Sequence, residues 1–553
     1  MESMTVASVF SNHCVLQREK PVCVFGEGVD GNLIEASLAD SNGIIVRSNK
    51  TTVNGGKWKV YLPSLQAQNN CTLTVACNSV SKVFTDVAVG EVWLAGGQSN
   101  MEFELGNCTE GPAELKDEKC PNVRFYYTQK IAWKDEHFFD SEKNTSWQIW
   151  GDEWTKAWSA IGYFFGKKLA KDLGVTVGII GCNWGGTSAS AWVDRTTLEK
   201  DSDLKTYLDE YDDAEKGKSI EQQIKEFDDY EIFHADWSKK CDELYKKYPQ
   251  IEWDEIQKRL GMCQWPGPKC CKNPFRPTGL YDCMLTRIMP YSLKGFLYYQ
   301  GESDDHKPTF YYKLFAALID KWRTDWSDNS LPFIFVQLPM HRYKQDKDFK
   351  NWCLIREAQL KAYETIKKTG MVCAADLGQY NDIHPKAKKT IAERMEKISL
   401  HTAYHLISSD AANGPIPKNM IVEGNKITIS FAHADDGFVL KSDDEEKQHY
   451  FDLEKRQNIK VPEHFTGFEV AGTDGIYFAA DFSFGKEEGA LNTITLSSPK
   501  VQEIKFARYA WYNYGPVTVY SHNGIPLTPF RTSAEDSVDT SKGHAKIQQI
   551  MEV

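Results

Sequence analysis

The sequence has no excess of positive charge and no long apolar run, and these absences exclude several classes of protein. Its 553 residues include 65 Lys or Arg and 77 Asp or Glu, which gives a net charge of −12. Binding to nucleic acid or to an anionic membrane requires clustered cations, so neither is expected as a partner. Residues 175–193 form the least charged stretch. Gly, Ser, Thr and Asn interrupt it, so it lacks the roughly 20 apolar residues of a membrane span.

The N-terminus also lacks the basic start and the apolar segment of a signal peptide. We therefore expect a cytoplasmic location, unless a leader has been removed. The 14 cysteines are too sparse for a disulfide scaffold, and none forms a CxxC pair. The tightest group has a spacing that fits no common zinc module: Cys263, Cys270, Cys271 and Cys283. We expect reduced thiols, no metal and no cofactor, and the sequence does not indicate an oligomeric state.

Residues 1–86 have the pattern of an all-β domain, because short β-branched or alternating runs are separated by Gly, Asn and Asp turns. Gly26, Gly28 and Gly31 form a GxGxxG pattern. This pattern binds dinucleotides only where a helix begins at the third glycine. A strand-like run follows here, so we predict a glycine-rich hairpin and no nucleotide site.

Residues 87–410 alternate between buried strands and amphipathic helices, which predicts a parallel sheet covered on both faces. Strands are expected at residues 87–95, 175–180, 295–299, 332–337 and 371–375. Helices are expected at residues 158–173, 310–322, 350–366 and 386–405. A charged segment with helical spacing, at about 195–271, predicts an inserted helical subdomain. Residues 411–530 return to a β pattern and predict a second β-domain, followed by a polar tail at 531–553.

Glycine-rich and polar segments follow four of the predicted strands. Ligands bind at the carboxyl ends of parallel strands, so these segments are expected to meet at one edge of the sheet. They are residues 96–101 (GGQSNM), 181–187 (GCNWGGT), 300–304 (QGESD) and 376–385, which ends in DIHP. One serine, paired glycines, a Gln-Gly-Glu and an Asp-x-His together suit acyl transfer.

Ser99 and His384 are the candidate nucleophile and general base. A serine hydroxyl is a weak nucleophile unless an imidazole accepts its proton. A carboxylate must then orient that imidazole, and this could be Asp382 or Glu302. Taken singly, the serine could be an ordinary turn residue and the histidine a helix-entry residue. No GxSxG surrounds Ser99, which argues against the nucleophile elbow of α/β hydrolases.

The oxyanion that develops during acyl transfer requires preorganised hydrogen-bond donors. The backbone amides of Ser99 and Gly186 and the side-chain amide of Gln300 are the candidates, and they follow three different predicted strands. Glycine suits this role because it lets the backbone approach the substrate closely.

Four blocks of the sequence resemble the sialate O-acetylesterase branch of the SGNH hydrolases. They are residues 97–101, 184–187, 299–303 and 382–385. The resemblance spans most of the chain, including a VLQRE segment at 15–19 and a YAW segment at 509–511. It implies a flavodoxin-like catalytic domain flanked by N-terminal and C-terminal β-domains, no metal, and removal of acetyl groups from sugar hydroxyls.

The resemblance also implies site residues. Ser99 takes the place of the nucleophile, His384 that of the base, and Gly186 and Gln300 those of the oxyanion hole. The family's usual aspartate lies three residues before the histidine, where this chain has Asn381, so we favour Asp382 over Glu302 as the third member. Substrate contacts are expected from Trp184, Asn100 and Tyr281.

We expect a carbohydrate O-acetylesterase, and acetylated sialic acid is the preferred prediction for its substrate. Acetylated plant glycans such as xylan or pectin are the alternative, and a carbohydrate-binding protein with a degenerate hydrolase core is a further one. The carboxylate of sialic acid should be met by a cation, preferably a bidentate arginine. Arg276 is the expected residue, with Arg342 and Arg356 as further candidates.

Overall fold

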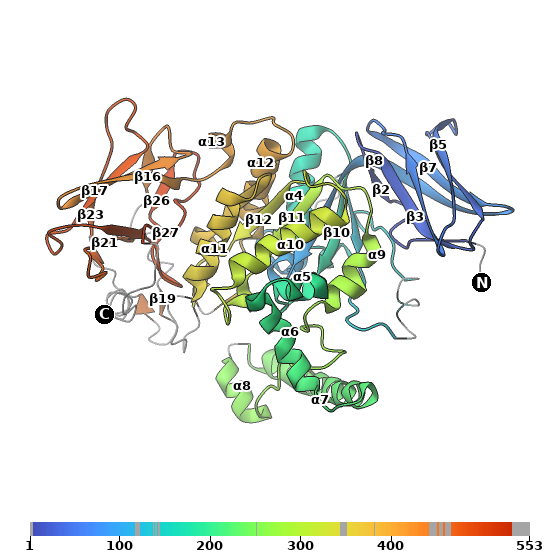
Figure 1. The fold of residues 1–553 in the computed structure, drawn as a ribbon, viewed down its shortest axis with the longest axis horizontal. Coiled ribbons are helices and arrows are strands. Elements are labelled where there is room, and N and C mark those ends of the chain that lie inside the picture. The colour runs from blue at the N-terminus through green and yellow to red at the C-terminus, as the bar shows by residue number, and fades with distance from the viewer. Residues whose placement is uncertain are drawn as a thin grey trace.

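The computed structural model describes residues 4–116, 122–135, 138, 141, 144–249, 251–342, 351–380, 382–441, 451–452, 457–458 and 466–533. Figure 1 shows a central region of helices and strands with a β-rich region at each end. The predicted α/β class is therefore confirmed. Within the described residues, no helix combines the length and the apolar character needed to cross a membrane.

The centre of the molecule is a parallel sheet. In spatial order its strands are β9 (Val123–Tyr127), β10 (Val177–Asn183), β8 (Val80–Gly97), β11 (Gly295–Tyr299), β12 (Phe333–Gln337) and β14 (Thr369–Cys373). All residues of β10, β11, β12 and β14 are buried, as expected where helices cover both faces. When β9 is set aside, the other five follow the flavodoxin-like order 2-1-3-4-5.

Five of these strands lie where the sequence predicts them, and β11 has the predicted bounds. β9 is not among the predicted strands, because its five residues include an arginine in an otherwise apolar run. The structure explains this charge: Arg124 Nη2 donates to Asp86 Oδ1 at 3.0 Å, so the guanidinium leaves the core.

Helices pack on both faces of the sheet, and β8 shows this directly. Trp93 lies edge-on to Phe165 of α4 (Ala160–Leu173), with ring centroids 5.4 Å apart. On the opposite face, a Cβ on Gly96 would lie 2.6 Å from the Trp322 ring of α10 (Tyr311–Asp325). The remaining core helices are α11 (Asn351–Thr365), which packs on α10, and α12 (Lys388–Thr402), which packs on α4.

The N-terminal region contains two sheets. One is β1 (Met4–Val6), β3 (Val22–Gly28) and β6 (Lys57–Leu62). In the other, β4 (Leu33–Ala39), β5 (Ile45–Thr52) and β7 (Gln68–Cys77) continue into β8. β2 (Val15–Gln17) also pairs with β8. The predicted glycine-rich hairpin is wrong, because β3 and β4 belong to different sheets.

The long strand β8 connects this region to the core. Its first residues pair with β7 in antiparallel fashion, and its last residues pair with β10 and β11 in parallel. The predicted boundary after residue 86 falls inside this strand, where its residues become buried. The nucleophile candidate Ser99 therefore follows a strand that is held in two sheets.

The C-terminal region is again built of strands. One sheet contains β16 (Ile416–Glu423), β17 (Lys426–Ala432), β24 (Thr493–Ser497) and β23 (Asp481–Phe484). A second contains β22 (Phe478–Ala479), β21 (Phe468–Ala471), β25 (Phe506–Tyr509) and β27 (Phe530–Arg531). Short pairs are formed by β18 (Phe438–Leu440) with β26 (Val519–Ser521), and by β19 (Phe451–Asp452) with β20 (Gln457–Asn458). Most of the predicted tail, from residue 534, lies outside the described residues.

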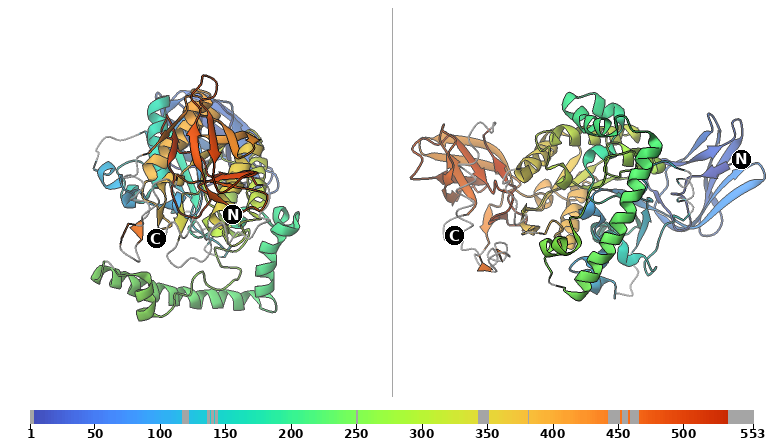
Figure 2. Two further views of the ribbon diagram at one scale, coloured as in Figure 1. Left: turned by 90° about the vertical axis from the view of Figure 1, so that its left-hand side faces the viewer. Right: turned by 90° about the horizontal axis from the view of Figure 1, so that it is seen from below.

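Between β10 and β11 the chain forms α5 (Arg195–Glu199), which packs against α10, and three helices that extend away from the body of the molecule (Figures 1 and 2). These three are α6 (Ser202–Glu215), α7 (Ile220–Lys247) and α8 (Trp253–Leu260). They occupy the segment where the sequence predicts a helical insertion. We call residues 202–268 the arm.

Candidate active site

The nucleophile candidate Ser99 follows a tight turn at the carboxyl end of β8. Gly97 has a φ of +131°, and a Cβ there would lie 2.2 Å from the carbonyl oxygen of Tyr299 in β11. Only glycine fits such a close approach between neighbouring strands. Ser99 then begins the short helix α1 (Ser99–Glu102), with its side chain partly exposed.

The structure brings Ser99 and His384 together across 285 positions of sequence, with Ser99 Oγ 2.8 Å from His384 Nε2. His384 lies in the segment between β14 and α12. Asp382 Oδ1 accepts a hydrogen bond from the His384 backbone amide at 2.9 Å, which is the geometry of an Asx turn. The turn fixes the backbone of the histidine.

The surroundings of His384 favour its neutral form. Burial lowers the pKa of His384 below its ordinary value of 6.5, and the charge of Lys388 lowers it further. Asp382 and Glu102 act in the opposite direction and weaken the shift. A neutral imidazole can accept a proton, so this environment suits a general base at neutral pH.

Neither predicted carboxylate forms a hydrogen bond with His384 Nδ1 in the described structure. Asp382 contacts the backbone of the histidine instead. Glu302 Oε1 accepts from Asn100 Nδ2 at 2.6 Å, and Glu302 Oε2 is buried with no partner in the described chain. Burial raises the pKa of Glu302 to about 7.

Asn100 links this carboxylate to a buried lysine. Its Oδ1 accepts a hydrogen bond from Lys388 Nζ, while its Nδ2 donates to Glu302 and to the Ile383 carbonyl. Burial lowers the pKa of Lys388 to about 7. Asn100 is itself 1% exposed, so the predicted substrate contact is wrong: the residue supports the site from below.

The glycine loop after β10 lies opposite Ser99. The Gly185 amide donates to Glu102 Oε2 at 2.8 Å. Gly186 has a φ of +77°, and a Cβ there would lie 2.8 Å from the rings of Phe275 and Trp265. In the described chain, neither the Ser99 amide nor the Gly186 amide has an acceptor, so both fit the predicted role of oxyanion donors.

Gln300 does not point into the cleft, and its predicted role as an oxyanion donor is wrong. Its Nε2 donates to Asp304 Oδ2 at 2.6 Å and to the Thr187 carbonyl at 3.2 Å, which uses both of its hydrogens. Its Oε1 accepts from the Tyr311 hydroxyl at 3.1 Å. Gln300 therefore holds the end of β11 against the glycine loop.

Gln98 presents a side-chain amide to the cleft, which Gln300 does not. It lines the cleft, and its Oε1 accepts from the Ser303 amide at 3.2 Å. No group in the described chain accepts from its Nε2, which leaves a side-chain donor beside Ser99. The sequence contains this residue in the GQSN block, but nothing in the pattern distinguishes it from a turn residue.

The remaining predicted substrate contacts lie outside the cleft. Trp184 packs on the core, with Lys130 Nζ 5.7 Å from its ring centroid. Tyr281 is buried, and its hydroxyl donates to Asp325 Oδ2 at 2.9 Å. Arg276 donates to the Ala132 carbonyl at 3.1 Å. None of these three residues lines the cleft, so the structure does not bring them to Ser99.

The two further arginine candidates are also distant from Ser99. Arg356 is buried in α11 and donates to the Tyr512 carbonyl, and Arg342 lies in β13 (His341–Arg342). Neither lines the cleft. The structure therefore places none of the three candidate guanidinium groups beside the serine.

The cleft in front of Ser99 has a volume of about 700 Å³. It is lined by strand-end residues, by Phe275 and by residues of the arm, among them Tyr207, Tyr211, Trp265 and Pro266. Lys269 is the only Lys or Arg among the described lining residues, and its Nζ is 3.0 Å from Glu210 Oε2. The described chain contains no cluster of three His, Cys, Asp or Glu side chains that could hold a metal.

Asp304 joins several segments of the site through hydrogen bonds, and the sequence pattern does not predict this role. Its fully buried carboxylate accepts hydrogen bonds from four donors: Ser188 Oγ (2.6 Å), the Ala189 amide (2.9 Å), Tyr207 Oη (3.2 Å) and Gln300 Nε2 (2.6 Å). These donors come from the loop after β10, from α6 and from the end of β11. The QGESD segment indicates only an acidic loop. The sequence does not reveal that Asp304 accepts these hydrogen bonds, because its donors lie up to 116 positions away.

We expect Asp304→Asn to lower the free energy of unfolding by about 2–3 kcal/mol, because an amide NH₂ would replace one acceptor oxygen and face donors. Denaturant unfolding followed by tryptophan fluorescence measures this change. Asp305→Asn is the matched control, because that side chain is exposed and should change stability by less than about 0.5 kcal/mol. Equal losses in the two variants would contradict the role given to Asp304.

Comparisons with known proteins agree with the sequence resemblance. Residues 263–400 match the family model described as "Carbohydrate esterase, sialic acid-specific acetylesterase". The sialate O-acetylesterase of Mus musculus is 24% identical over 456 residues, which cover 75% of this chain and 76% of that protein. The Homo sapiens sialate O-acetylesterase is 24% identical over 471 residues, covering 79% and 78%.

A crystal structure of a carbohydrate acetylesterase from Xanthomonas citri has the same fold. It matches with a TM-score of 0.71 and 23% identity, and covers 96% of this chain and 100% of that one. The family model spans Glu302 and His384 but begins after Ser99. The predicted resemblance is confirmed: the chain is similar to the sialate O-acetylesterases over most of its length, and part of it matches the model of a carbohydrate esterase family.

Proposed function

We propose that this protein is a serine O-acetylesterase that removes acetyl groups from sugar hydroxyls. The observation that carries the proposal is the 2.8 Å contact between Ser99 Oγ and His384 Nε2 at the cleft. A hydroxyl within hydrogen-bond distance of a neutral imidazole is poised for proton transfer. The relatives named as acetylesterases support the same chemistry.

In the first half-reaction, His384 Nε2 takes the proton of Ser99 as Oγ attacks the acetyl carbonyl carbon. The carbonyl oxygen becomes an oxyanion and accepts hydrogen bonds from the amides of Ser99 and Gly186, with Gln98 Nε2 as a third donor. The intermediate collapses when His384 gives its proton to the departing sugar oxygen. This leaves an acetyl group on Ser99.

In the second half-reaction, His384 takes a proton from water, which attacks the acetyl carbon. Collapse of the second intermediate returns the proton to Ser99 Oγ and releases acetate. Asp382 contributes by holding the histidine backbone, and its charge favours the imidazolium that forms in both steps. It is a positioning residue in this proposal, because it forms no hydrogen bond with His384 Nδ1.

The charge of the cleft bears on the substrate. The names of the relatives favour acetylated sialic acid, which carries a carboxylate. The described cleft instead contains Glu210, Glu302 and Asp305, and its one ammonium, Lys269, contacts Glu210, which is also paired with Lys307 behind the lining. A site for a carboxylate should present an unpaired cation, so the geometry favours an uncharged acetylated sugar.

We expect Ser99→Ala to lower kcat for p-nitrophenyl acetate by at least about 10³-fold while the protein remains folded, because no other nucleophile is activated. Spectrophotometric release of p-nitrophenol measures the rate, and circular dichroism verifies the fold. Ser64→Ala, an exposed serine of the N-terminal region, is the control. Hydrolysis by Ser99→Ala at the parental rate would refute the proposal. Sugar binding without ester hydrolysis by the parent would favour the carbohydrate-binding alternative.

The pH profile tests the electrostatics around His384. Lys388 has a pKa of about 7, so it is charged at the acidic pH where His384 becomes protonated, and its charge opposes that protonation. Lys388→Met should raise the pKa of His384. The acid limb of kcat/KM should therefore move to higher pH, because the base is lost earlier as the pH falls.

Lys389→Met is the matched control for this shift, because Lys389 is not among the groups that perturb His384. We expect its acid limb to coincide with that of the parent. An acid limb that stays in place or moves to lower pH in Lys388→Met would show that the lysine charge does not act on the histidine.

Acetate release from 9-O-acetylated sialic acid and from acetylated xylo-oligosaccharides, measured side by side, tests the substrate. We expect kcat/KM to be higher for the uncharged sugar by about tenfold or more, because the cleft offers no guanidinium to the carboxylate. Hydrolysis of p-nitrophenyl acetate serves as the common reference. Faster release from sialic acid would show that the specificity named for the relatives extends to this chain.

A further inference from the structure

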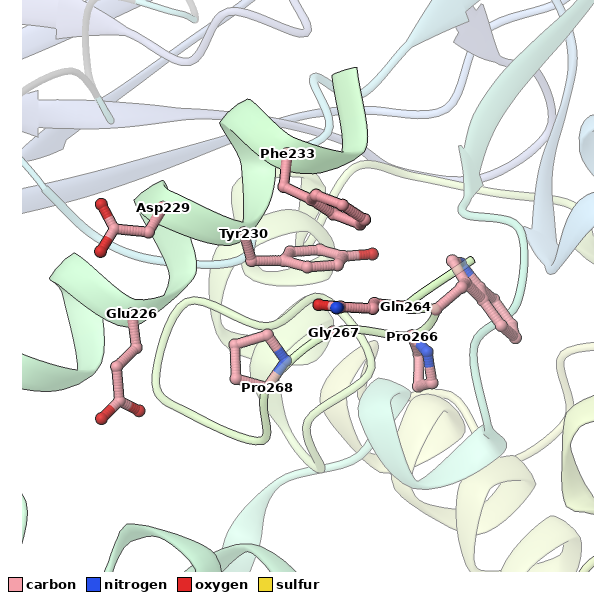
Figure 3. Close-up of a pocket in the computed structure, with 9 residues that line it drawn as sticks. Glu226, Asp229, Tyr230, Phe233, Gln264, Pro266, Gly267 and Pro268 are labelled. Carbon is pink, nitrogen blue, oxygen red and sulfur yellow. The ribbon is translucent and has the colours of Figure 1, made fainter. Parts of the chain in front are cut away.

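Two cavities on the arm adjoin the active-site cleft, and all three share Trp265 in their lining. The first, of about 650 Å³, lies between α7 and the segment 264–268. The second, of about 490 Å³, lies between α7, α8 and Cys263. We call these two cavities and the Trp265 ring between them the arm groove. Figure 3 shows the first cavity.

Trp265 connects the arm groove to the reacting groups. Its ring packs against Gly186, where a Cβ would lie 2.8 Å from Trp265 Cζ2, and lies edge-on to Phe275 at a centroid distance of 5.2 Å. The residue is nevertheless 55% exposed. A large aromatic side chain with one packed edge and an open surface beside the glycine loop offers a stacking platform.

The first cavity continues this aromatic surface. Tyr230 and Phe233 project from α7 toward the segment that contains Gln264 and Gly267 (Figure 3). Gly267 has a φ of +83°, and a Cβ there would lie 2.6 Å from the Tyr230 ring, so the backbone is fitted to that side chain. Phe233 is 38% exposed and supplies an open ring to the cavity.

The second cavity adds a pair of indole rings. Trp237 and Trp253 lie edge-on with centroids 5.4 Å apart. Trp237 is buried, whereas Trp253 is 46% exposed. Trp237 Nε1 donates to the Gly261 carbonyl at 3.2 Å, which fixes this ring beneath the exposed one. Each of the three cavities therefore presents an exposed or partly exposed aromatic side chain.

The groove is longer than one sugar needs. Its lining on α7 runs from Glu226 to Asp242. These 16 positions correspond to about 24 Å at the helical rise of 1.5 Å per residue. A single acetylated sugar in the cleft would leave this surface unused, whereas a chain of sugars leaving the cleft past Trp265 would follow it.

The charge of the lining selects against a polyanion. The described lining of the two arm cavities contains neither Lys nor Arg, and it carries Asp242 together with Glu226 and Asp229, which are paired with Lys218 and Lys225. Gln264 and Gln257 add amide groups, which can donate to and accept from hydroxyls. Aromatic faces combined with carboxylates and amides suit an uncharged, hydroxyl-rich chain.

We propose that the arm groove binds the sugar units that flank the acetylated one, so that the substrate is an uncharged glycan chain. This inference rests on the proposed esterase function and adds its substrate class. The acetylated unit lies at Ser99, Trp265 stacks on a neighbouring unit, and Phe233 and Trp253 contact units further along the chain. Continuity of the groove with the cleft through Trp265 favours this occupant over a second protein.

The test uses the full-length protein with p-nitrophenyl acetate and with acetylated xylo-oligosaccharides of one to six sugars. We expect kcat/KM of the parent to rise with chain length. Phe233→Ala and Trp253→Ala should each lower the ratio of kcat/KM for the hexasaccharide to that for the monosaccharide by about three- to tenfold, because each removes one aromatic contact.

Tyr245→Ala is the matched control, because Tyr245 is a 40% exposed aromatic residue of the same helix outside both cavities. Its ratio should equal that of the parent. A kcat/KM that does not depend on chain length, or the same ratio in all four proteins, would overturn the inference while leaving the esterase function intact. No hydrolysis of p-nitrophenyl acetate by the parent would instead refute the function itself.

A binding measurement completes the test. Quenching of tryptophan fluorescence in Ser99→Ala by xylohexaose, cellohexaose and mannohexaose reports occupation of the groove without turnover. We expect at least one hexasaccharide to bind, and binding to weaken in Ser99→Ala combined with Trp253→Ala. Absence of binding by all three, or a dimer by light scattering that Phe233→Ala dissociates, would show that the groove serves another occupant.

Discussion

The contact between Ser99 and His384 depends on a loop that crosses the end of the sheet. β8 and β14, which precede the two residues, are separated by β11 and β12. Three strand intervals of about 4.8 Å place β14 roughly 14 Å from β8. The chain closes this distance with the segment after Cys373, in which β15 (Gln379–Tyr380) pairs with β13 and Asp382 fixes the histidine backbone. Without this crossing, the imidazole would remain at the edge of the sheet.

Buried ionisable side chains fix the segments that form the site. Asp304 collects four donors from three parts of the chain, so a single carboxylate fixes the glycine loop, α6 and the end of β11 relative to one another. On the other side, Asn100 separates Glu302 from Lys388 by one amide. Burial raises the pKa of Glu302 and lowers the pKa of Lys388, so burial opposes the charged form of each group.

The sequence predicts the parts of this structure that depend on local pattern. Apolar runs reveal the buried strands, and because parallel strands end at one edge, Ser99, the glycine loop and His384 could be placed together. The direction of a side chain at that edge is not a local property. Gln300 and Gln98 are both glutamines at strand ends, but hydrogen bonds with Asp304, Thr187 and Tyr311 hold the first away from the cleft.

Long-range partners explain the other failures as well. Two of the arginines predicted to bind a carboxylate donate instead to backbone carbonyl groups of distant segments, Arg276 to Ala132 and Arg356 to Tyr512. The sequence around an arginine does not show whether its guanidinium group binds a ligand or a backbone carbonyl. Similarly, the arginine within β9 is explained by its hydrogen bond with Asp86, which the sequence does not predict.

The position of the arm in the chain links the fold to the substrate. The arm is inserted between β10 and β11, and these are the two strands that flank β8 in the sheet. The chain leaves the sheet at the carboxyl end of β10, where Asn183 pairs with Gly97 close to Ser99, and it enters β11 at the opposite end of the sheet. Before it crosses to that end, it returns to the carboxyl edge and brings Trp265 against Gly186. In a sheet of this order, the same helices placed after β12 would emerge nearer the histidine edge and would not extend the cleft from the serine outward.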